Sequence, residues 1–415
     1  MSKDKKRGAW FYVGWALIAV AAAALLPFLA IYLSVPAYQF EEPKPFYGSY
    51  LYNPYQDIDP DAWQKCNFHC HSRKYFGITN GRKSKETAID SVYGILGYDH
   101  AGISDYMSIN QHNHGEPDYI PAYEHGYGIF RKTHQLCIGA ERVCNIDYPF
   151  MQNLDMKQHL LNKLSETTRF AVPVHSSFTT GYKEKEMMYL SNYRLLEIMN
   201  PYGNALKHWD MALSSGHRVY AIGDDDTHDI SNMHEVCLNM TVINAPLIAD
   251  SLLEALDCGR SYTVNLDNYF FHHNTIDEKS QLVALLPHLT MAKLLGDTLT
   301  VTTSANKIDT VKFIGQNGKV LDIQVNTDTA TYVIGTEDTY VRTELTFNYG
   351  QHLYLNPVTR HATPKPIDRR LDSVNTVRTL MTRFIYIVAA IALIYYLAKK
   401  AKDKKAAPKN DSCQE

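Results

Sequence analysis

The residues Asn67-Phe68-His69-Cys70-His71 end an apolar, strand-like run with two imidazoles that are separated by one residue. Because side chains alternate along a strand, His69 and His71 are expected to point the same way. Residues 221–228, Ala-Ile-Gly-Asp-Asp-Asp-Thr-His, repeat this design: an apolar run leads into Asp226 and His228. Both stretches place metal-ligand chemistry at the end of a predicted strand.

Four stretches between these two follow the same pattern, each marking an apolar run with one polar residue. The marked residues are Asp105, Glu141, His175 and Glu197. From His71 to Asp226 the steps are 34, 36, 34, 22 and 29 residues, and a strand with its crossover helix takes roughly 30 residues. A polar residue at the end of each successive strand is typical of a β/α-barrel active site. The spacing therefore predicts an enzyme with an α/β fold built on such a barrel.

The rest of the chain changes character twice. Strand-like runs alternate with helical patterns up to about residue 265, and short β-branched or aromatic runs separated by turns follow from about residue 298. The first pattern indicates an α/β domain, and the second a small all-β sandwich. The predicted parts are residues 1–40 (basic start and transmembrane helix), 41–62 (connector), 63–270 (metal-dependent barrel), 271–360 (β-sandwich), 361–378 (linker) and 379–415 (second transmembrane helix and basic tail).

Both ends of the chain predict membrane anchors. Residues 10–33 are almost wholly apolar and follow a lysine-rich start, whereas residues 384–398 form a shorter apolar run before a lysine cluster. A spanning helix needs about 20 apolar residues, and lysines outside both runs place both termini in the cytoplasm. We therefore expect two transmembrane helices in a membrane, such as the bacterial inner membrane, and a barrel in the periplasm or outside the cell.

Charge and cysteine content narrow the choice of partners. The net charge is −3, which gives no indication of a nucleic-acid partner. Six of the seven cysteines lie in the segment that is expected to be exported, where disulfides are permitted. Cys137 and Cys144 are close enough in sequence to bridge a loop, but core cysteines fit equally well, and no bond is assigned.

The order His-x-His, Asp, Glu, His, Asp-x-His resembles the polymerase and histidinol phosphatase (PHP) domain family over about residues 64–265. The resemblance implies a distorted seven-stranded β/α barrel that holds two or three divalent ions (Zn, Mn or Fe) and hydrolyses phosphoesters. Two departures are Tyr106 and Ser176, at positions where the family often has His and Pro. The metal ligands that the resemblance implies are His69, His71, Asp105, Glu141, His175, Asp226 and His228.

In the predicted reaction a metal-bound hydroxide attacks phosphorus, and further residues are expected to take part in it. Arg73 and Arg142 are the predicted phosphate contacts, because a guanidinium binds phosphate through two hydrogen bonds. His175 or His228 is expected to protonate the leaving group. Glu197 is expected to line the site as a ligand or a base, and Asp224 and Asp225 to cap the next turn or orient the ligands.

The predicted function is a membrane-anchored, metal-dependent phosphoesterase that acts on a phosphorylated substrate of unknown class. Two alternatives remain open at this point. An amidohydrolase barrel also begins with His-x-His and ends with a strand-end Asp, but it commonly has a bridging carboxylated lysine where this chain has Glu141 and His175. A barrel retained only for binding is the other alternative, and Tyr106 is its main support.

Overall fold

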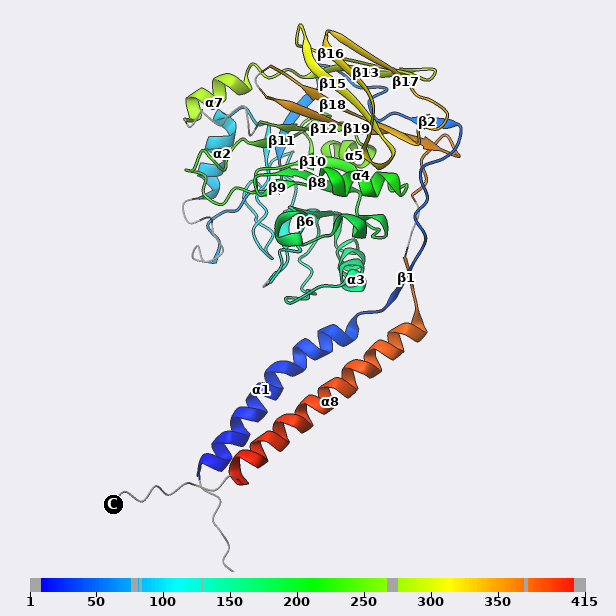
Figure 1. Ribbon diagram of the computed structural model, residues 1–415. Coiled ribbons are helices and arrows are strands. Elements are labelled where there is room, and N and C mark those ends of the chain that lie inside the picture. The colour runs from blue at the N-terminus through cyan, green and yellow to red at the C-terminus, as the bar shows by residue number, and fades with distance from the viewer. Residues whose placement is uncertain are drawn as a thin grey trace, which may run out of the picture. The chain divides into compact units, whose positions relative to one another are not determined.

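The computed structural model describes residues 9–75, 81, 84–128, 130–266, 275–348, 350–368 and 372–406. The chain divides into two compact units (Figure 1). The main unit runs from Phe40 to Asp372, and the terminal unit joins Met1–Gln39 and Ser373–Glu415. All the predicted site residues belong to the main unit.

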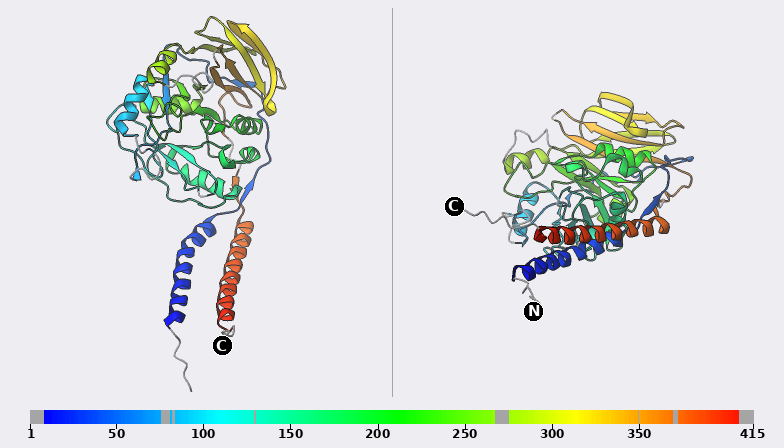
Figure 2. Two further views of the ribbon diagram at one scale, coloured as in Figure 1. Left: turned by 60° about the vertical axis from the view of Figure 1, so that its left-hand side comes forward. Right: turned by 60° about the horizontal axis from the view of Figure 1, so that its bottom comes forward.

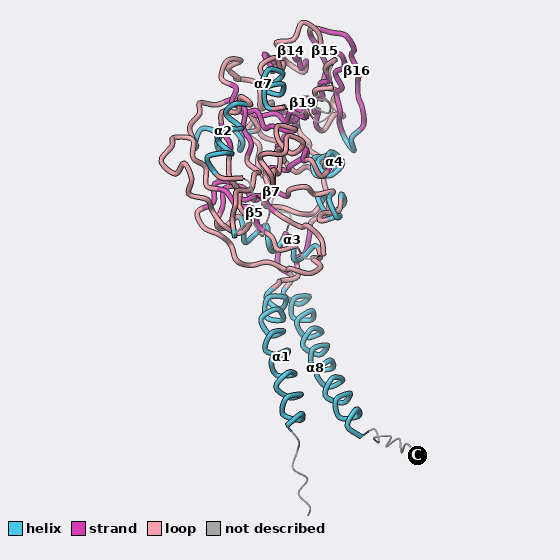
Figure 3. Tube along the Cα trace, turned by 90° about the vertical axis from the view of Figure 1, so that its left-hand side faces the viewer, coloured by secondary structure: helices cyan, strands magenta, loops and turns pink. Residues whose placement is uncertain are grey.

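The terminal unit contains two long helices, α1 (Ala9–Ser34) and α8 (Thr376–Ala406), which lie side by side in each view (Figures 1, 2 and 3). Arg383 Nε donates to the carbonyl oxygen of Leu33 at 2.8 Å. Helix α8 begins at Thr376, earlier than the sequence predicted, and Arg383 lies within it.

One helix in the described part of the chain is long and apolar enough to cross a membrane. It is the 25-residue segment Thr376–Lys400, whose length of about 38 Å exceeds a hydrocarbon core of roughly 30 Å. Helix α1, several of whose side chains lie outside the described residues, is not among the candidate spans. The prediction of two transmembrane helices is therefore wrong. Residues 1–8 and 407–415, which include the predicted basic start and the end of the tail, lie outside the described residues.

The largest sheet runs through most of the main unit and has nine strands. Their spatial order is β16 (Lys319–Thr327), β15 (Ile308–Gly315), β18 (Tyr340–Thr346), β19 (His352–His361), β12 (Ser261–Asn265), β11 (Asn239–Asn244), β3 (Trp63–Asn67) and β4 (His100–Ala101), with β2 (Tyr50–Tyr52) also paired to β19. Strand β19 pairs with both β18 and β12. The expected β-sandwich is therefore continuous with the predicted barrel region and is not a separate domain.

Smaller sheets and short helices complete the main unit. One sheet contains β5 (Ala122–His125), β6 (Gln135–Ala140) and β7 (Thr168–Pro173); a second contains β10 (Tyr220–Gly223), β8 (Leu195–Asn200) and β9 (Gly203–Asn204); and a third contains β13 (Leu289–Leu295), β14 (Thr298–Thr303) and β17 (Thr329–Val333). A further pair, β1 (Tyr38–Phe40) with β20 (Asp372–Val374), consists mostly of residues of the terminal unit. The helices are α2 (Glu86–Ile95), α3 (Leu154–Leu164), α4 (Leu206–Ser214), α5 (Ala249–Cys258) and α7 (Ile276–Val283), with short 3₁₀ turns at Phe178–Thr180, Glu184–Met188 and Gln316–Gly318.

Strand direction rules out the predicted barrel. The strands of a β/α barrel are all parallel, but among the ladders between described strands only β3–β4 and β8–β10 are parallel. Strand β6 is antiparallel to both β5 and β7, and β11 is antiparallel to both β3 and β12. No closed barrel forms among the described strands, and the prediction of a seven-stranded β/α barrel is wrong. The chain reverses between β5 and β6 through a hairpin loop instead of a crossover helix.

Buried apolar clusters hold the sheets together. In the C-terminal half, Val301 and Ala330 of the β13–β14–β17 sheet share a cluster with Val311 and Leu345 of the large sheet, so these two layers face each other. A second cluster centres on Trp209 of α4. A third joins residues of the strand ends that carry the predicted site: Phe68, Val172 and Ile222. Cys137 and Cys144 are both buried and free, so no disulfide links them.

Candidate metal centre

The loops that follow β3 and β10 bring the two metal-ligand motifs together. The backbone N–H of His71 donates to the carbonyl oxygen of Thr227 at 2.9 Å. On the other side, the N–H of Phe68 donates to Asp224 Oδ1 at 2.7 Å. These bonds fix the two loops to each other independently of the ligand side chains. Asp224 thereby holds the backbone beside His69.

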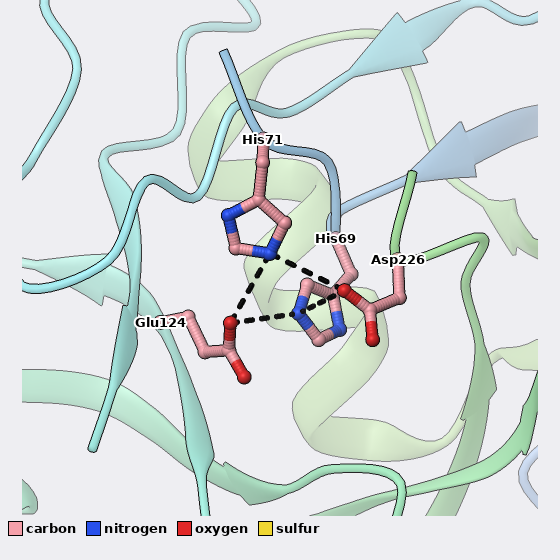
Figure 4. A group of neighbouring side chains, drawn as sticks. All are labelled: His69, His71, Glu124 and Asp226. Carbon is pink, nitrogen blue, oxygen red and sulfur yellow. Dashed lines mark hydrogen bonds and ion pairs between the residues drawn. The ribbon is translucent and has the colours of Figure 1, made fainter. Parts of the chain in front are cut away.

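Four buried side chains, the first group, converge on one point: His69, His71, Glu124 and Asp226 (Figure 4). Asp226 Oδ1 lies 3.2 Å from Nε2 of both His69 and His71. Glu124 Oε2 lies 3.1 Å from His71 Nε2 and 3.5 Å from His69 Nε2. Because no side chain of the group is more than 3% exposed, bulk water does not screen these charges.

The spacing in the first group suits ligands of a shared ion. Two ligands that each lie about 2.1 Å from a zinc ion are roughly 3.4 Å apart at the tetrahedral angle. His69 Nε2 and Glu124 Oε2 are buried and make no hydrogen bond, although buried polar atoms are almost always satisfied. The first group can therefore hold a metal ion.

A second group consists of Glu124, His134 and His175 and can also hold an ion. Glu124 Oε1 lies 2.5 Å from His134 Nδ1 and 3.1 Å from His175 Nε2. The two oxygens of this carboxylate thus face different sets of histidines: Oε2 faces the first group and Oε1 the second. Glu124 is the residue that the two groups share.

The position of the His134 ring depends on two glycines in the hairpin loop between β5 and β6. Gly126 has φ +131° and Gly128 has φ +36°, and glycine adopts such angles at little cost. A Cβ atom at either position would lie 2.6 Å from an atom of the His134 ring. The loop therefore leaves room for the imidazole beside Glu124.

Glu197, in the middle of β8, orients ligands of both groups. Its Oε1 lies 2.9 Å from His69 Nδ1, while its Oε2 accepts hydrogen bonds from the backbone N–H of His175 at 2.6 Å and from Asn200 Nδ2 at 3.0 Å. A carboxylate on the far nitrogen of a ligand histidine fixes the tautomer and the ring orientation. This geometry makes Glu197 an orienting residue of His69.

Two of the candidate ligands have unusual backbone conformations. His175 has φ +31° and Asp226 has φ +47°. A non-glycine residue in this region costs on the order of 1–3 kcal/mol, and such strain is concentrated at functional sites. The surrounding hydrogen bonds hold both residues in place, including the bond from His175 to Glu197.

Charge in the two groups favours a bound cation. Burial alone would raise the pKa of Glu124 and Asp226, but the adjacent imidazoles lower the pKa of both carboxyl groups below their usual range. Burial would also lower the pKa of His71, but the neighbouring carboxylates of Asp226 and Glu124 raise it to about 9. Both carboxylates are therefore ionised at neutral pH. Each neighbouring imidazole can therefore carry a proton or, in place of that proton, bind a metal ion.

Aromatic rings border the first group. The rings of Tyr106 and His71 stack with centroids 4.4 Å apart, and those of His71 and His228 stack at 4.5 Å. Burial, with Glu124 and Asp226 nearby, raises the pKa of Tyr106, so its phenol stays protonated. His228 Nε2 lies 3.4 Å from Asp226 Oδ1, and burial lowers the pKa of His228 to about 4. His228 is therefore a neutral imidazole at the edge of the first group.

Three other predicted site residues lie outside both groups. Asp105 is buried and accepts hydrogen bonds from Ser72 N and Oγ, each at 2.8 Å, so it supports the loop that carries His71. Glu141 and Arg142 are exposed. They follow β6, whose other end adjoins His134. The carboxylate that the sequence placed at Glu141 is instead Glu124, because β6 runs antiparallel to its neighbours.

Arg73 is exposed and directly follows Ser72, and its backbone N–H donates to the carbonyl oxygen of Ser84 at 2.8 Å. Asp225 accepts hydrogen bonds from Tyr93 Oη at 2.9 Å and from the N–H of Cys237 at 2.6 Å. Asp225 therefore supports the loop after β10.

The sequence-based prediction missed Glu124 and His134. A signal for them exists, since two short runs, residues 122–125 and 135–140, flank a loop that contains Gly126 and Gly128. That arrangement is typical of a hairpin. In a hairpin, the last residues of one strand and the first residues of the next lie at the same edge of the sheet.

No family model matches the chain, and no curated protein or solved structure matches it either. The resemblance to the PHP family therefore stays a prediction that depends on the motif residues alone.

Proposed function

We propose that the main unit is a metal-dependent phosphoesterase with a two-ion centre bridged by Glu124. The observation that carries the proposal is the sharing of one buried carboxylate by two groups of histidines. In this proposal His69, His71 and Asp226 complete one ion site, and His134 and His175 complete the other. Zn, Mn and Fe all suit this mixture of imidazole and carboxylate ligands.

Divalent ions in such a pair would supply Lewis acidity and lower the pKa of a bound water. The side chains around them have separate roles in the proposal. Asn200 Nδ2 lies 3.0 Å from Glu197 Oε2 and 3.4 Å from Asp226 Oδ2, so it keeps both carboxylates in place. His228 is neutral at pH 7 and partly accessible, and we propose that it accepts a proton from the attacking water. We also propose that Arg73, two residues after His71, contacts the phosphate.

The identity of the bridging residue supports phosphoester over amide hydrolysis. The amidohydrolase alternative expects a carboxylated lysine between the two ions. Here the position shared by the two groups is occupied by Glu124.

Hydrolytic activity with different metal ions and substrates tests the proposal. The full-length chain, purified in detergent, is assayed with Mn, Zn and Fe against phosphomonoesters, phosphodiesters and amides. We expect phosphoester hydrolysis that His71→Ala and Asp226→Ala each reduce by a factor of about a hundred or more. Hydrolysis of amides alone would replace this proposal with the amidohydrolase. Hydrolysis that survives both substitutions would refute the proposed site.

We further propose that the main unit lies on the side of the membrane opposite the cytoplasm. The candidate span Thr376–Lys400 ends in a lysine-rich segment, and such segments remain in the cytoplasm. A reporter fused to the C-terminus should be active only in the cytoplasm. A reporter that is active outside would reverse the orientation.

A further inference from the structure

A cavity of about 780 Å³ lies at the ends of the strands opposite the metal centre. Arg169 lies at the start of β7, whereas His175 follows the end of that strand. Likewise, Arg218 precedes β10 and Asp226 follows it. None of the candidate metal ligands is among the residues that line this cavity, which we call the basic cavity.

The lining of the basic cavity is strongly basic. Two carboxylates, Asp257 and Asp368, accompany five cationic side chains, which are Lys44, Arg169, Arg194, Arg218 and Arg360. The guanidinium of Arg360 donates to three carbonyl oxygens, those of Asp338 and Gly335 at 2.7 Å each and that of Gly48 at 3.5 Å. No carboxylate pairs with it in the described part of the chain. The cavity therefore has an excess of positive charge.

One exposed carboxylate occupies the most favourable anion position in this cavity. Arg218 donates from Nε and Nη2 to the two oxygens of Asp368, at 3.0 and 2.9 Å, and Arg194 Nη2 donates to the same carboxylate. The arginine side chains are 14% and 22% exposed, but Asp368 is 46% exposed. Because the carboxylate is nearly half exposed, water screens its ion pairs, and a more highly charged anion can compete with it for the two guanidinium groups.

We propose that the basic cavity binds an organic phosphate, whose phosphate group replaces the Asp368 carboxylate on Arg194 and Arg218. A phosphate dianion carries more charge than a carboxylate and has three peripheral oxygens. It can therefore accept the paired donors of one guanidinium and a donor of the second at the same time. The unmatched charge of Arg360 favours a dianion over a monoanion for the same reason.

The size and walls of the cavity indicate that the ligand has an organic part. Cavities of about 300–1,000 Å³ hold drug-sized ligands, and a free phosphate ion would fill only a small part of this one. Tyr47 and Ile367, which are 66% and 71% exposed, supply apolar surface in the lining. An aromatic or aliphatic group attached to the phosphate can pack against these side chains. Because the cavity is separate from the metal centre, this inference does not depend on the proposed hydrolysis.

Calorimetric titration of the full-length chain with phenyl phosphate tests the inference. The protein is kept in detergent and treated with EDTA, so that bound metal ions do not recruit the phosphate. We expect Asp368→Asn to tighten binding by about tenfold, because it removes the competing charge while keeping the side-chain shape. Arg218→Lys and Arg194→Lys should each weaken binding by about tenfold, because they keep the charge but lose the paired donors.

Three controls make the result decisive. Asp328→Asn changes an exposed aspartate outside the cavity and should leave the affinity unchanged, and so should His71→Ala in the metal centre. Benzoate, which carries a carboxylate on the same ring, should bind at least about tenfold more weakly than phenyl phosphate. An unchanged or weaker affinity in Asp368→Asn, loss of binding in His71→Ala, or equal affinity for benzoate would each overturn the inference.

Discussion

Glu124 has the central position in the candidate metal centre, because its two oxygens face two sets of imidazoles. Replacing it with glutamine keeps the shape of the side chain but turns one oxygen into a nitrogen donor that cannot bind a cation. We expect Glu124→Gln to reduce the metal bound to the full-length chain by about one ion or more. Elemental analysis of the purified protein measures this change.

Glu141→Gln is the matched control for that substitution. It makes the same chemical change at the exposed glutamate that the sequence pattern favoured, and it should leave the metal content unchanged. Equal losses in the two variants would contradict the assignment of Glu124. A loss in Glu141→Gln alone would restore the original prediction.

His361, at the end of β19, predicts how acid affects stability. Burial first, and Arg218 second, lower its pKa from 6.5 to about 4, so below pH 6.5 the unfolded chain binds a proton that the folded chain does not. The contribution of His361 to the free energy of unfolding is therefore complete above about pH 6.5 and is lost as the pH falls towards 4. The contribution amounts to roughly 2–3 kcal/mol. His361→Gln should make the denaturant midpoint less dependent on pH in this interval than it is in the unmodified chain.

At the residue scale, the sequence pattern selected those candidate ligands that follow strands in the direction the pattern assumed. His69, His71, His175 and Asp226 all follow an apolar run, and the structure brings all four to the candidate groups. The pattern missed Glu124 and His134, because Glu124 lies within a strand and His134 precedes a strand. A pattern that looks only for ligands after strands cannot find them.

At the scale of elements, the decisive property is the direction of β6. Hydrophobic alternation predicts that a segment is a strand, but it does not say whether its neighbours are parallel. Reversing one strand in a sheet exchanges which of its ends lies at the site. That exchange brings His134 to the centre and leaves Glu141 at the opposite end, so the error in the fold and the error in the site have one cause.

The packing between β10 and its neighbours predicts a sensitive position. A Cβ atom at Gly223 would lie 2.4 Å from Cγ2 of Thr263 and 3.3 Å from Cβ of Met199. Gly223→Ala should therefore destabilise the main unit by about 1–3 kcal/mol, which thermal unfolding can measure. At Gly94 in α2 nothing lies within 4 Å of the added atom, and Gly94→Ala should stabilise the unit by about 0.5–1 kcal/mol. Equal changes in stability at the two positions would show that the close packing around Gly223 does not cause the loss of stability.

At the scale of the whole molecule, the sequence indicated a metal site and a C-terminal apolar span but not the architecture between them. The C-terminal strands were expected to form an independent sandwich, because they are short and follow one another through local turns. Their membership in the large sheet arises from the pairing of β19 with β12, which joins segments almost ninety residues apart along the chain. Such long-range pairing leaves no local mark on the sequence.

Metal removal should lower the stability of the whole main unit. Without an ion, the buried donors of the two groups keep unsatisfied atoms and concentrated charge, and a ligand that binds only the folded state stabilises it by mass action. We expect EDTA to lower the unfolding temperature of the full-length chain by roughly 5 °C or more. In His71→Ala the EDTA effect should be smaller. An EDTA effect of the same size in that variant would mean that the stabilising ion binds elsewhere.

Glu197 connects the two groups through its two oxygens, because one holds the ring of His69 and the other the backbone of His175. Occupation of either ion site should therefore prepare the geometry of the other, so the two ions are expected to bind cooperatively. Titration of the apoprotein with Zn should give a sigmoidal curve. In Glu197→Gln, the curve should become shallower and the two binding events should separate.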